Sequence, residues 1–104
     1  MSWAVTELDV IRWAEARGII ENSDSKTQLL KAVSEMGELA DAIIKRDRPN
    51  IIDGLGDVLV CLIVVGTLED VDLTQCLESA YNEIKDRKGY LNKDGVFVKD
   101  GSSK

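Results

Sequence analysis

Apolar side chains recur at helical spacing in four stretches of the chain, and polar or glycine-containing segments separate these stretches. Because residues three and four apart share one face of an α-helix, the pattern predicts helices over residues 6–17, 27–47, 50–67 and 73–88. Thr6 is the predicted cap of the first helix, and Asp24 or Ser25 is the predicted cap of the second. Residues 1–5 are expected to form a short lead-in, and Gly18 is expected to end the first helix.

The third stretch differs from the others, because after Asp57 it is apolar without a break through Val65. A helix that is hydrophobic all round is expected to be buried on every side. The run is too short to cross a bilayer, which takes about 20 apolar residues, and we therefore interpret it as core. Arg48-Pro49 is expected to end the preceding helix, since a proline disfavours helical geometry in the residue before it.

The end of the chain has an apolar pair on each side of Asp94-Gly95, which predicts a small hairpin within residues 90–99. Residues 101–104 are expected to form a disordered tail. Helix-forming residues dominate and aromatic residues make up only 5% of the chain. The predicted fold class is therefore all-α, a four-helix bundle with a short C-terminal hairpin or extended tail, in a single domain over residues 1–104.

Composition and charge exclude several classes of function. A chain that is 44% hydrophobic and 31% charged is typical of a folded globular protein. The net charge of −6 argues against a nucleic-acid polymer as partner, although metal ions would still allow an anionic small ligand. The absence of histidine removes histidine acid–base chemistry and Cys/His zinc sites. Cys61 and Cys76 lie in apolar helical patterns and are interpreted as buried thiols. Together with the lack of a visible signal peptide, they favour a reducing cytoplasm.

Two pairs of carboxylates carry the candidate chemistry. Asp53 and Asp57 are four residues apart on one helix, and Glu35 and Glu38 are three apart on another, so each pair shares a helical face. Ionised carboxylates beside an apolar helix must be paired or must hold a metal, and Mg²⁺ prefers such oxygen ligands. The alternative is that Glu35 and Glu38 belong to a solvated face and that Lys31 merely forms a helical ion pair with Glu35.

Glycines stand beside the aspartates in the third helix. Gly54 and Gly56 are poor helix residues, each costing about 1 kcal/mol relative to alanine. Glycines at such positions usually permit the close approach of another backbone or of a ligand.

The segments QLLKAVSEMGELADAI, DGLGDVLV and YNEIKDRKG with the following GVFVK resemble the MazG-like members of the all-α NTP pyrophosphatase superfamily, particularly the compact bacterial and phage-type proteins. The resemblance covers roughly residues 10–98. The family pattern is E-x-x-E on one helix and E-x-x-D on the next. Glu35 and Glu38 match the first pair and Asp57 matches the last aspartate, but Gly54 stands in the place of the remaining glutamate. We expect Asp53 to substitute for it. Ser34 also stands where many relatives carry another glutamate.

The resemblance implies a Mg²⁺-dependent enzyme, with Mn²⁺ as a substitute ion, that hydrolyses nucleoside triphosphates to monophosphate and pyrophosphate. It implies that Glu35, Glu38, Asp57 and Asp53 bind the metal ions, which lower the pKa of the attacking water. Either Glu38 or Glu35 would accept the proton of that water. The residues expected to contact substrate are Lys31, Lys85, Arg87 and Lys88 at the phosphates, Asn82 at the sugar or base, and Trp13 stacked on the base. The alternatives are that Trp13 belongs to the core and that Lys85, Arg87 and Lys88 only complement the dipole of their helix.

Relatives of this kind form dimers or dimers of dimers, and the apolar third helix also favours a homodimer or a tetramer. We expect no membrane partner. Substrate candidates include dGTP, dCTP and dUTP, with a purine deoxynucleotide preferred. The alternative is a non-catalytic helical oligomerisation or adaptor module, whose stability would not depend on divalent ions.

Overall fold

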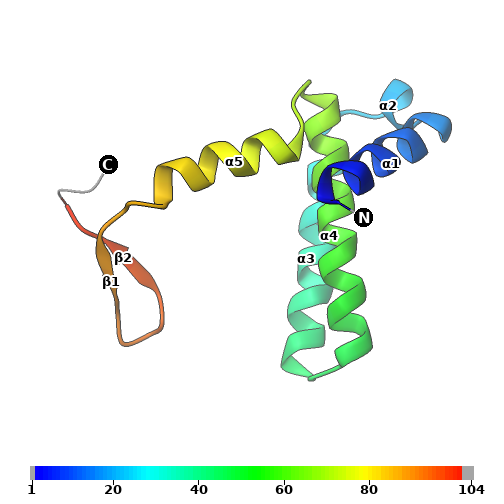
Figure 1. Ribbon diagram of the computed structural model, residues 1–104. Helices are drawn as coiled ribbons and strands as arrows, with labels where there is room; N and C mark the ends of the chain where they lie inside the picture. Colours follow the sequence, from blue (N-terminus) through cyan, green and yellow to red (C-terminus); the bar gives the residue numbers. More distant parts are fainter. Residues whose placement is uncertain (1, 102–104) are drawn as a thin grey trace. The chain divides into compact units, whose positions relative to one another are not determined.

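The computed structural model describes residues 2–101 and contains five helical segments and one small hairpin (Figure 1). The elements are α1 (Trp3–Ala16), α2 (Ile19–Asn22), α3 (Ser25–Ile44), α4 (Arg48–Leu68), α5 (Leu73–Ile84), β1 (Gly89–Leu91) and β2 (Phe97–Lys99). The predicted all-α class is confirmed, although the single-turn helix α2 was not expected. The chain divides into two compact units, Met1–Thr74 and Gln75–Lys104, each of which is described by itself. The prediction of a single domain stays a prediction.

The helix starts follow from local side-chain hydrogen bonds. Ser2, not Thr6, caps α1, because its side-chain oxygen accepts a hydrogen bond from the amide of Val5. The predicted lead-in and the Thr6 cap are therefore wrong, and Thr6 lies within the helix. Asp24 is confirmed as the cap of α3, since its carboxylate accepts from the amide of Thr27 at 2.7 Å.

Proline begins α4 and does not separate it from α3. Asp47 caps α4 by accepting from the amide of Asn50, and Pro49 lies in the first turn, where its missing N–H group is not needed. The predicted start of this helix at residues 50–53 is therefore wrong, because α4 begins at Arg48 and α3 has already ended at Ile44. Gly18, which precedes α2, adopts a left-handed conformation with φ of 74°, as expected for a helix stop.

Helices α3 and α4 lie side by side as a hairpin and make the most extensive helix–helix packing in the first unit (Figure 1). The side of α3 that meets α4 buries Ala32 and Ala42 and half-buries Glu35. The side of α3 that carries the glutamates therefore faces α4, as the predicted metal site requires. The apolar stripe of α3 is exposed; its members are Leu29, Leu30, Val33, Met36, Ile43 and Ile44.

The core of the first unit lies along the second half of α4, against which α1 also packs. Its buried residues in α4 include Cys61, Ile63 and Val64, so the prediction for Cys61 is confirmed. Ile52, Leu55 and Leu59 are exposed in the single chain, so at Leu59 the predicted burial of the apolar run is not complete within one chain.

By length and composition α4 could span a membrane, because the helix is 21 residues long and contains an 18-residue window with a mean hydropathy of 2.2. The core helix of a soluble protein passes the same test, and 28% of this segment is buried within the described structure. The packing of α4 against both α1 and α3 favours its interpretation as a core helix.

The second unit begins within α5, which ends at Ile84, four residues earlier than predicted. The predicted hairpin is confirmed, with Tyr90 of β1 paired with Val98 of β2. In its turn the Asn92 side chain accepts hydrogen bonds from the amides of residues 94 and 96, and Gly95 has a φ of 79°. Cys76 is exposed, so the expectation that it is buried is wrong. Most of the predicted tail, residues 102–104, lies outside the described residues.

A buried carboxylate connects α1 to the start of α5 within the first unit. Glu7 is only 4% exposed, and it accepts hydrogen bonds from the amide of Leu73 at 2.6 Å and from the amide and hydroxyl of Thr74 at 3.2 and 2.6 Å. Burial by itself raises the pKa of Glu7, but the hydrogen bonds outweigh burial and leave that pKa below 4.5. A carboxylate on α1 thus supplies the hydrogen-bond acceptor that the free amides at the N-terminus of α5 require.

Candidate active site

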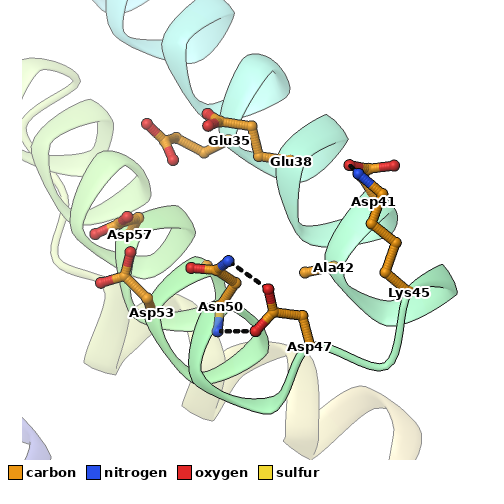
Figure 2. Close-up of a pocket in the computed structure, with 10 residues that line it drawn as sticks. Glu35, Glu38, Asp41, Ala42, Lys45, Asp47, Asn50, Asp53 and Asp57 are labelled. Atoms are coloured by element: carbon orange, nitrogen blue, oxygen red, sulfur yellow. Dashed lines mark hydrogen bonds and ion pairs between the residues drawn. The ribbon is translucent and has the colours of Figure 1, made fainter.

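The hairpin of α3 and α4 contains an acidic cleft of about 240 Å³ (Figure 2). Its floor includes Gly54 and Ala42, both of which are buried. Polar side chains line the rest of the cleft: Glu35, Glu38, Asp41, Lys45, Asp47, Asn50, Asp53 and Asp57.

The cleft brings together the four carboxylates that the sequence singled out. Glu35 and Glu38 come from α3, and Asp53 and Asp57 come from α4 (Figure 2). The spacings of three and four residues place each pair on the side of its helix that faces the other helix. Glu35 is half-buried between the helices and Glu38 is exposed, so the interpretation of this face as merely solvated is not supported at Glu35.

Negative charge accumulates at the inner end of this cleft. Burial raises the pKa of Asp57, and the neighbouring charges of Asp53 and Glu35 raise that pKa further. Lys31 opposes this shift, and its ammonium lies 3.6 Å from the carboxylate of Glu35. The predicted helical ion pair between Lys31 and Glu35 is thus present, but the side chain of Lys31 remains 60% exposed. One exposed lysine does not balance three neighbouring carboxylates.

The chemistry of these side chains fits a divalent cation of the Mg²⁺ type. The carboxylates supply only oxygen ligands, and after burial the negative charges of Asp53 and Glu35 are the next causes of the raised pKa of Asp57. Within residues 2–101, no three acidic or cysteine side chains converge closely enough to hold one ion as they stand. Binding would therefore require the side chains of α3 and α4 to turn toward a shared ion. The cleft offers room for such a movement.

Gly54, which stands in the place of the expected glutamate, packs closely against Leu39 of α3. A Cβ atom on residue 54 would lie 3.3 Å from two side-chain atoms of Leu39 and 3.4 Å from its Cα atom. These contacts are tight, so a side chain at residue 54 would require Leu39 to shift by a few tenths of an ångström. The expected close approach is therefore confirmed for Gly54, whereas nothing lies within 4 Å of a Cβ atom on Gly56. Asp53, one residue earlier, lines the cleft, and its substitution for the missing glutamate stays a prediction.

The cleft contains a basic residue, Lys45, that was not predicted from the sequence. Lys45 lines it and forms an ion pair of 2.9 Å with Asp41, and the hydrogen bond and charge of Asp41 raise the pKa of Lys45. Helical spacing contained a signal for this residue, because positions 38, 42 and 45 continue the face that begins at Glu35.

Two further residues at the same end of the cleft stabilise the hairpin. Asp47 accepts a hydrogen bond of 2.7 Å from the side chain of Asn50 in addition to capping α4 (Figure 2). These contacts fix the start of α4 and thereby position Asp53 one turn further along the helix.

Trp13 lies beside the acidic cleft and not within it. It lines a pocket of about 390 Å³ between α1 and α4, which shares Asp57 with the cleft. The indole is 43% exposed, and the guanidinium of Arg17 lies 4.8 Å from its ring centroid, a cation–π contact. A base stacked on Trp13, as predicted from the sequence, would therefore lie in a pocket next to the carboxylates.

The remaining substrate residues predicted from the sequence belong to the second unit, whereas the cleft belongs to the first. Asn82 is exposed on α5, Lys85 and Lys88 are exposed beyond its end, and Arg87 is half-buried there. Their roles as substrate-binding residues stay predictions.

The fold and the cleft together define an all-α protein with a carboxylate-lined site suited to divalent cations. The profile of the MazG nucleotide pyrophosphohydrolase domain matches residues 23–91, which include all four carboxylates. Because this match spans more than half of the chain, the protein belongs to the MazG nucleotide pyrophosphohydrolase family. The resemblance seen in the sequence is thereby confirmed.

Two similar proteins come from phages. An uncharacterized 18.2 kDa protein in the rep-hol intergenic region of Haemophilus phage HP1 (strain HP1c1) is 31% identical over 65 residues, or 62% of this chain and 39% of that protein. The chain therefore spans well under two thirds of that relative. A solved structure, the cyanophage S-2L MazG-like pyrophosphohydrolase bound to dGDP and three catalytic Mn²⁺ ions per active site, matches with a TM-score of 0.69. The match covers 96% of this chain and 98% of the cyanophage chain at 19% sequence identity, and it shows that the two proteins share a fold.

Proposed function

We propose that this protein is a divalent-metal-dependent nucleoside triphosphate pyrophosphohydrolase, which converts a (d)NTP and water to a (d)NMP and pyrophosphate. Membership of the MazG family supports the reaction class. The observation that carries the proposal is the convergence of Glu35, Glu38, Asp53 and Asp57 on one cleft from two helices. Mg²⁺ is the proposed ion and Mn²⁺ its substitute, in keeping with the Mn²⁺ ions of the cyanophage protein.

The four carboxylates would hold the ions, with Asp53 acting in place of the glutamate that Gly54 excludes. When bound, divalent ions neutralise phosphate charge and activate water for attack. Glu38, or alternatively Glu35, accepts the proton of the attacking water, because both line the cleft beside Asp57.

Cationic side chains stabilise the charge that develops on the phosphates. Lys31 at one end of the carboxylate group and Lys45 at the other are the candidates in the first unit. The proposed contributions from the second unit are Lys85, Arg87 and Lys88 at the phosphates and Asn82 at the sugar or base. Glu35 and Asp41 hold Lys31 and Lys45 in ion pairs that a triphosphate would have to replace.

The preferred substrate is a purine deoxynucleotide such as dGTP. The pocket that contains Trp13 adjoins the acidic cleft, so a base held there would leave the phosphates near the carboxylates. The cyanophage protein binds dGDP, which supports the same choice. We place this activity in the cytoplasm, or in the host cytoplasm for a phage-encoded protein, where nucleoside triphosphates are found.

We further propose that two copies pair through the apolar surface of the helical hairpin, as a homodimer or within a tetramer. On α3, Leu30 is 70% exposed and Ile44 is 79% exposed, and on α4 Ile52 is 61% exposed. A continuous apolar helix face of this kind is unfavourable in water and is typical of a subunit interface. Because the acidic sides of α3 and α4 face each other, this pairing would leave the cleft accessible.

The reaction is tested by incubating the protein with each canonical (d)NTP and Mg²⁺ and separating the products. The expected products are monophosphate and pyrophosphate, and the ranking of rates identifies the substrate. Release of orthophosphate and diphosphate would contradict the proposed bond. No hydrolysis by a folded, oligomeric protein would favour the non-catalytic adaptor, for which the exposed apolar faces are the supporting observation.

Glu38→Gln tests the site, because the change removes a charge and nearly conserves volume. We expect a loss of turnover of at least about 100-fold without unfolding, the usual range for an acid–base residue. Glu21→Gln is the matched control, since Glu21 is exposed on α2 and lies outside the cleft. A fully active Glu38→Gln variant would remove Glu38 from the site.

The interface is tested by Ile44→Glu, which places a charge in the apolar stripe. Sedimentation should show a dimer or tetramer for the wild type and a smaller species for this variant. Lys26→Glu is the control, because Lys26 is an exposed polar position at the start of the same helix. A monomeric wild type at micromolar concentration would contradict the proposed pairing.

A further inference from the structure

The pocket that contains Trp13 has one charged side chain, Asp9, to which the proposed reaction assigns no role. On α1 its wall is made by residues that recur every three or four positions, and on α4 by Asp57 and Val60. The α1 residues are Thr6, Asp9, Val10 and Trp13. With about 390 Å³, the pocket falls within the usual range for small-ligand sites. Asp9 is the group in this wall that bears a charge, and it lies opposite the aspartate shared with the acidic cleft.

Asp9 is exposed and makes no hydrogen bond or ion pair within residues 2–101, so both of its carboxylate oxygens are available to a ligand. The neighbouring Thr6 hydroxyl already donates to the carbonyl of Ser2 at 3.2 Å. Asp9 also lies beyond the first turn of α1, where it would otherwise serve the helix dipole. Its carboxylate is therefore available to accept hydrogen bonds from a ligand in the pocket.

The donor pattern of the bases identifies the ligand. A carboxylate presents two acceptors side by side and pairs best with two adjacent donors. Guanine offers this pair, in its N1–H group and its exocyclic 2-amino group. Adenine and cytosine place a donor beside an acceptor, and thymine and uracil flank one N–H group with two carbonyls. Val10, Trp13 and Val60 supply apolar walls for a purine ring.

The geometry points to Asp9 as the residue that selects guanine, by accepting hydrogen bonds from the N1–H and 2-amino groups of the base. This inference rests on the proposed function, because it assumes that the phosphates occupy the acidic cleft. Asp57 lines both sites, so they are adjacent, and a nucleotide whose base contacts Asp9 would extend toward the carboxylates.

The experiment compares dGTP with dITP, whose hypoxanthine base lacks only the 2-amino group. For the wild type we expect kcat/KM to be about 10- to 100-fold higher for dGTP, the usual discrimination of a bidentate contact. Asp9→Asn should bring this ratio close to one, because an amide has one acceptor oxygen and its NH₂ group opposes the second donor. Glu15→Gln is the control, since Glu15 is exposed on the same helix outside the pocket, and it should keep the wild-type ratio.

Equal rates with dGTP and dITP in the wild type, or an unchanged ratio in Asp9→Asn, would overturn the role of Asp9 while leaving the pyrophosphohydrolase intact. If no nucleotide is hydrolysed, the proposed function fails, and calorimetric binding of dGMP against dIMP then decides the role of Asp9. Tighter binding of dGMP that Asp9→Asn abolishes would support the inference, and equal binding would overturn it. The wild-type comparison requires no variant to fold.

Discussion

Replacement of the buried Glu7 by glutamine should destabilise the protein strongly while conserving its shape. The carboxylate accepts two hydrogen bonds of 2.6 Å and one of 3.2 Å from Leu73 and Thr74. A glutamine has one acceptor oxygen, and its NH₂ group would oppose an amide that has no other partner. The loss of charge-assisted hydrogen bonds and an unsatisfied donor together cost about 2–3 kcal/mol. For a domain of this size, that loss lowers Tm by about 10–20 °C.

The same carboxylate predicts how stability depends on pH. Because the pKa of Glu7 is lower in the folded protein than its ordinary 4.5, the charged form is favoured by folding. Its contribution is complete above pH 4.5 and is lost as pH falls through the lower, folded-state pKa. The Glu7→Gln variant cannot lose this contribution, so the gap in unfolding free energy between wild type and variant should narrow in acid.

Urea denaturation followed by circular dichroism measures both effects, at neutral pH and at intervals down to pH 3. Glu15→Gln removes a charge from an exposed position of the same helix and should change the free energy of unfolding by less than about 0.5 kcal/mol. A Glu7→Gln variant as stable as this control at neutral pH would refute the reasoning, and so would a gap that widens in acid.

Three further predictions concern the acidic cleft. Mg²⁺ or Mn²⁺ should raise the Tm of the wild type by mass action. Without metal, Asp57→Asn should raise Tm by relieving repulsion, but metal should no longer change the Tm of this variant. Thermal scans in which metal leaves the wild-type Tm unchanged, or raises that of Asp57→Asn equally, would count against a metal site. Gly56→Ala should stabilise α4 by about 1 kcal/mol, whereas Gly54→Ala should be neutral or destabilising because of its contact with Leu39; equal stabilisation in urea melts would contradict the close packing. Lys45→Gln should raise KM for the triphosphate in steady-state kinetics, and an unchanged KM would exclude Lys45 from phosphate binding.

The candidate carboxylates were predictable because their chemistry is local. Glu35 with Glu38 and Asp53 with Asp57 each share a helical face, and that relation depends only on spacing. The caps of the helices were less predictable, since Ser2 and Thr6 are both good capping residues and the hydrophobic pattern begins close to both.

The orientation of α3 was not predictable from hydrophobicity alone. Its apolar stripe, which includes Leu30 and Ile44, is exposed, and its glutamate face packs on α4. An amphipathic pattern states that one face avoids water, but it does not identify the surface that covers that face. Glu7 was missed for a related reason, because its partners lie 66 and 67 residues away and no local pattern relates them.

The contact between Gly54 and Leu39 restricts how this site can change over evolution. A glutamate at residue 54 would place its Cβ atom 3.3 Å from the Cβ and Cδ1 atoms of Leu39, so the side chain at residue 39 would have to move or be exchanged. A glutamate at residue 54 alone would therefore be destabilising, whereas an accompanying exchange at residue 39 would let a further carboxylate join the group formed by Glu35, Glu38, Asp53 and Asp57. The two positions should vary together among descendants of this chain, and Asp53 should become dispensable only where that exchange has occurred.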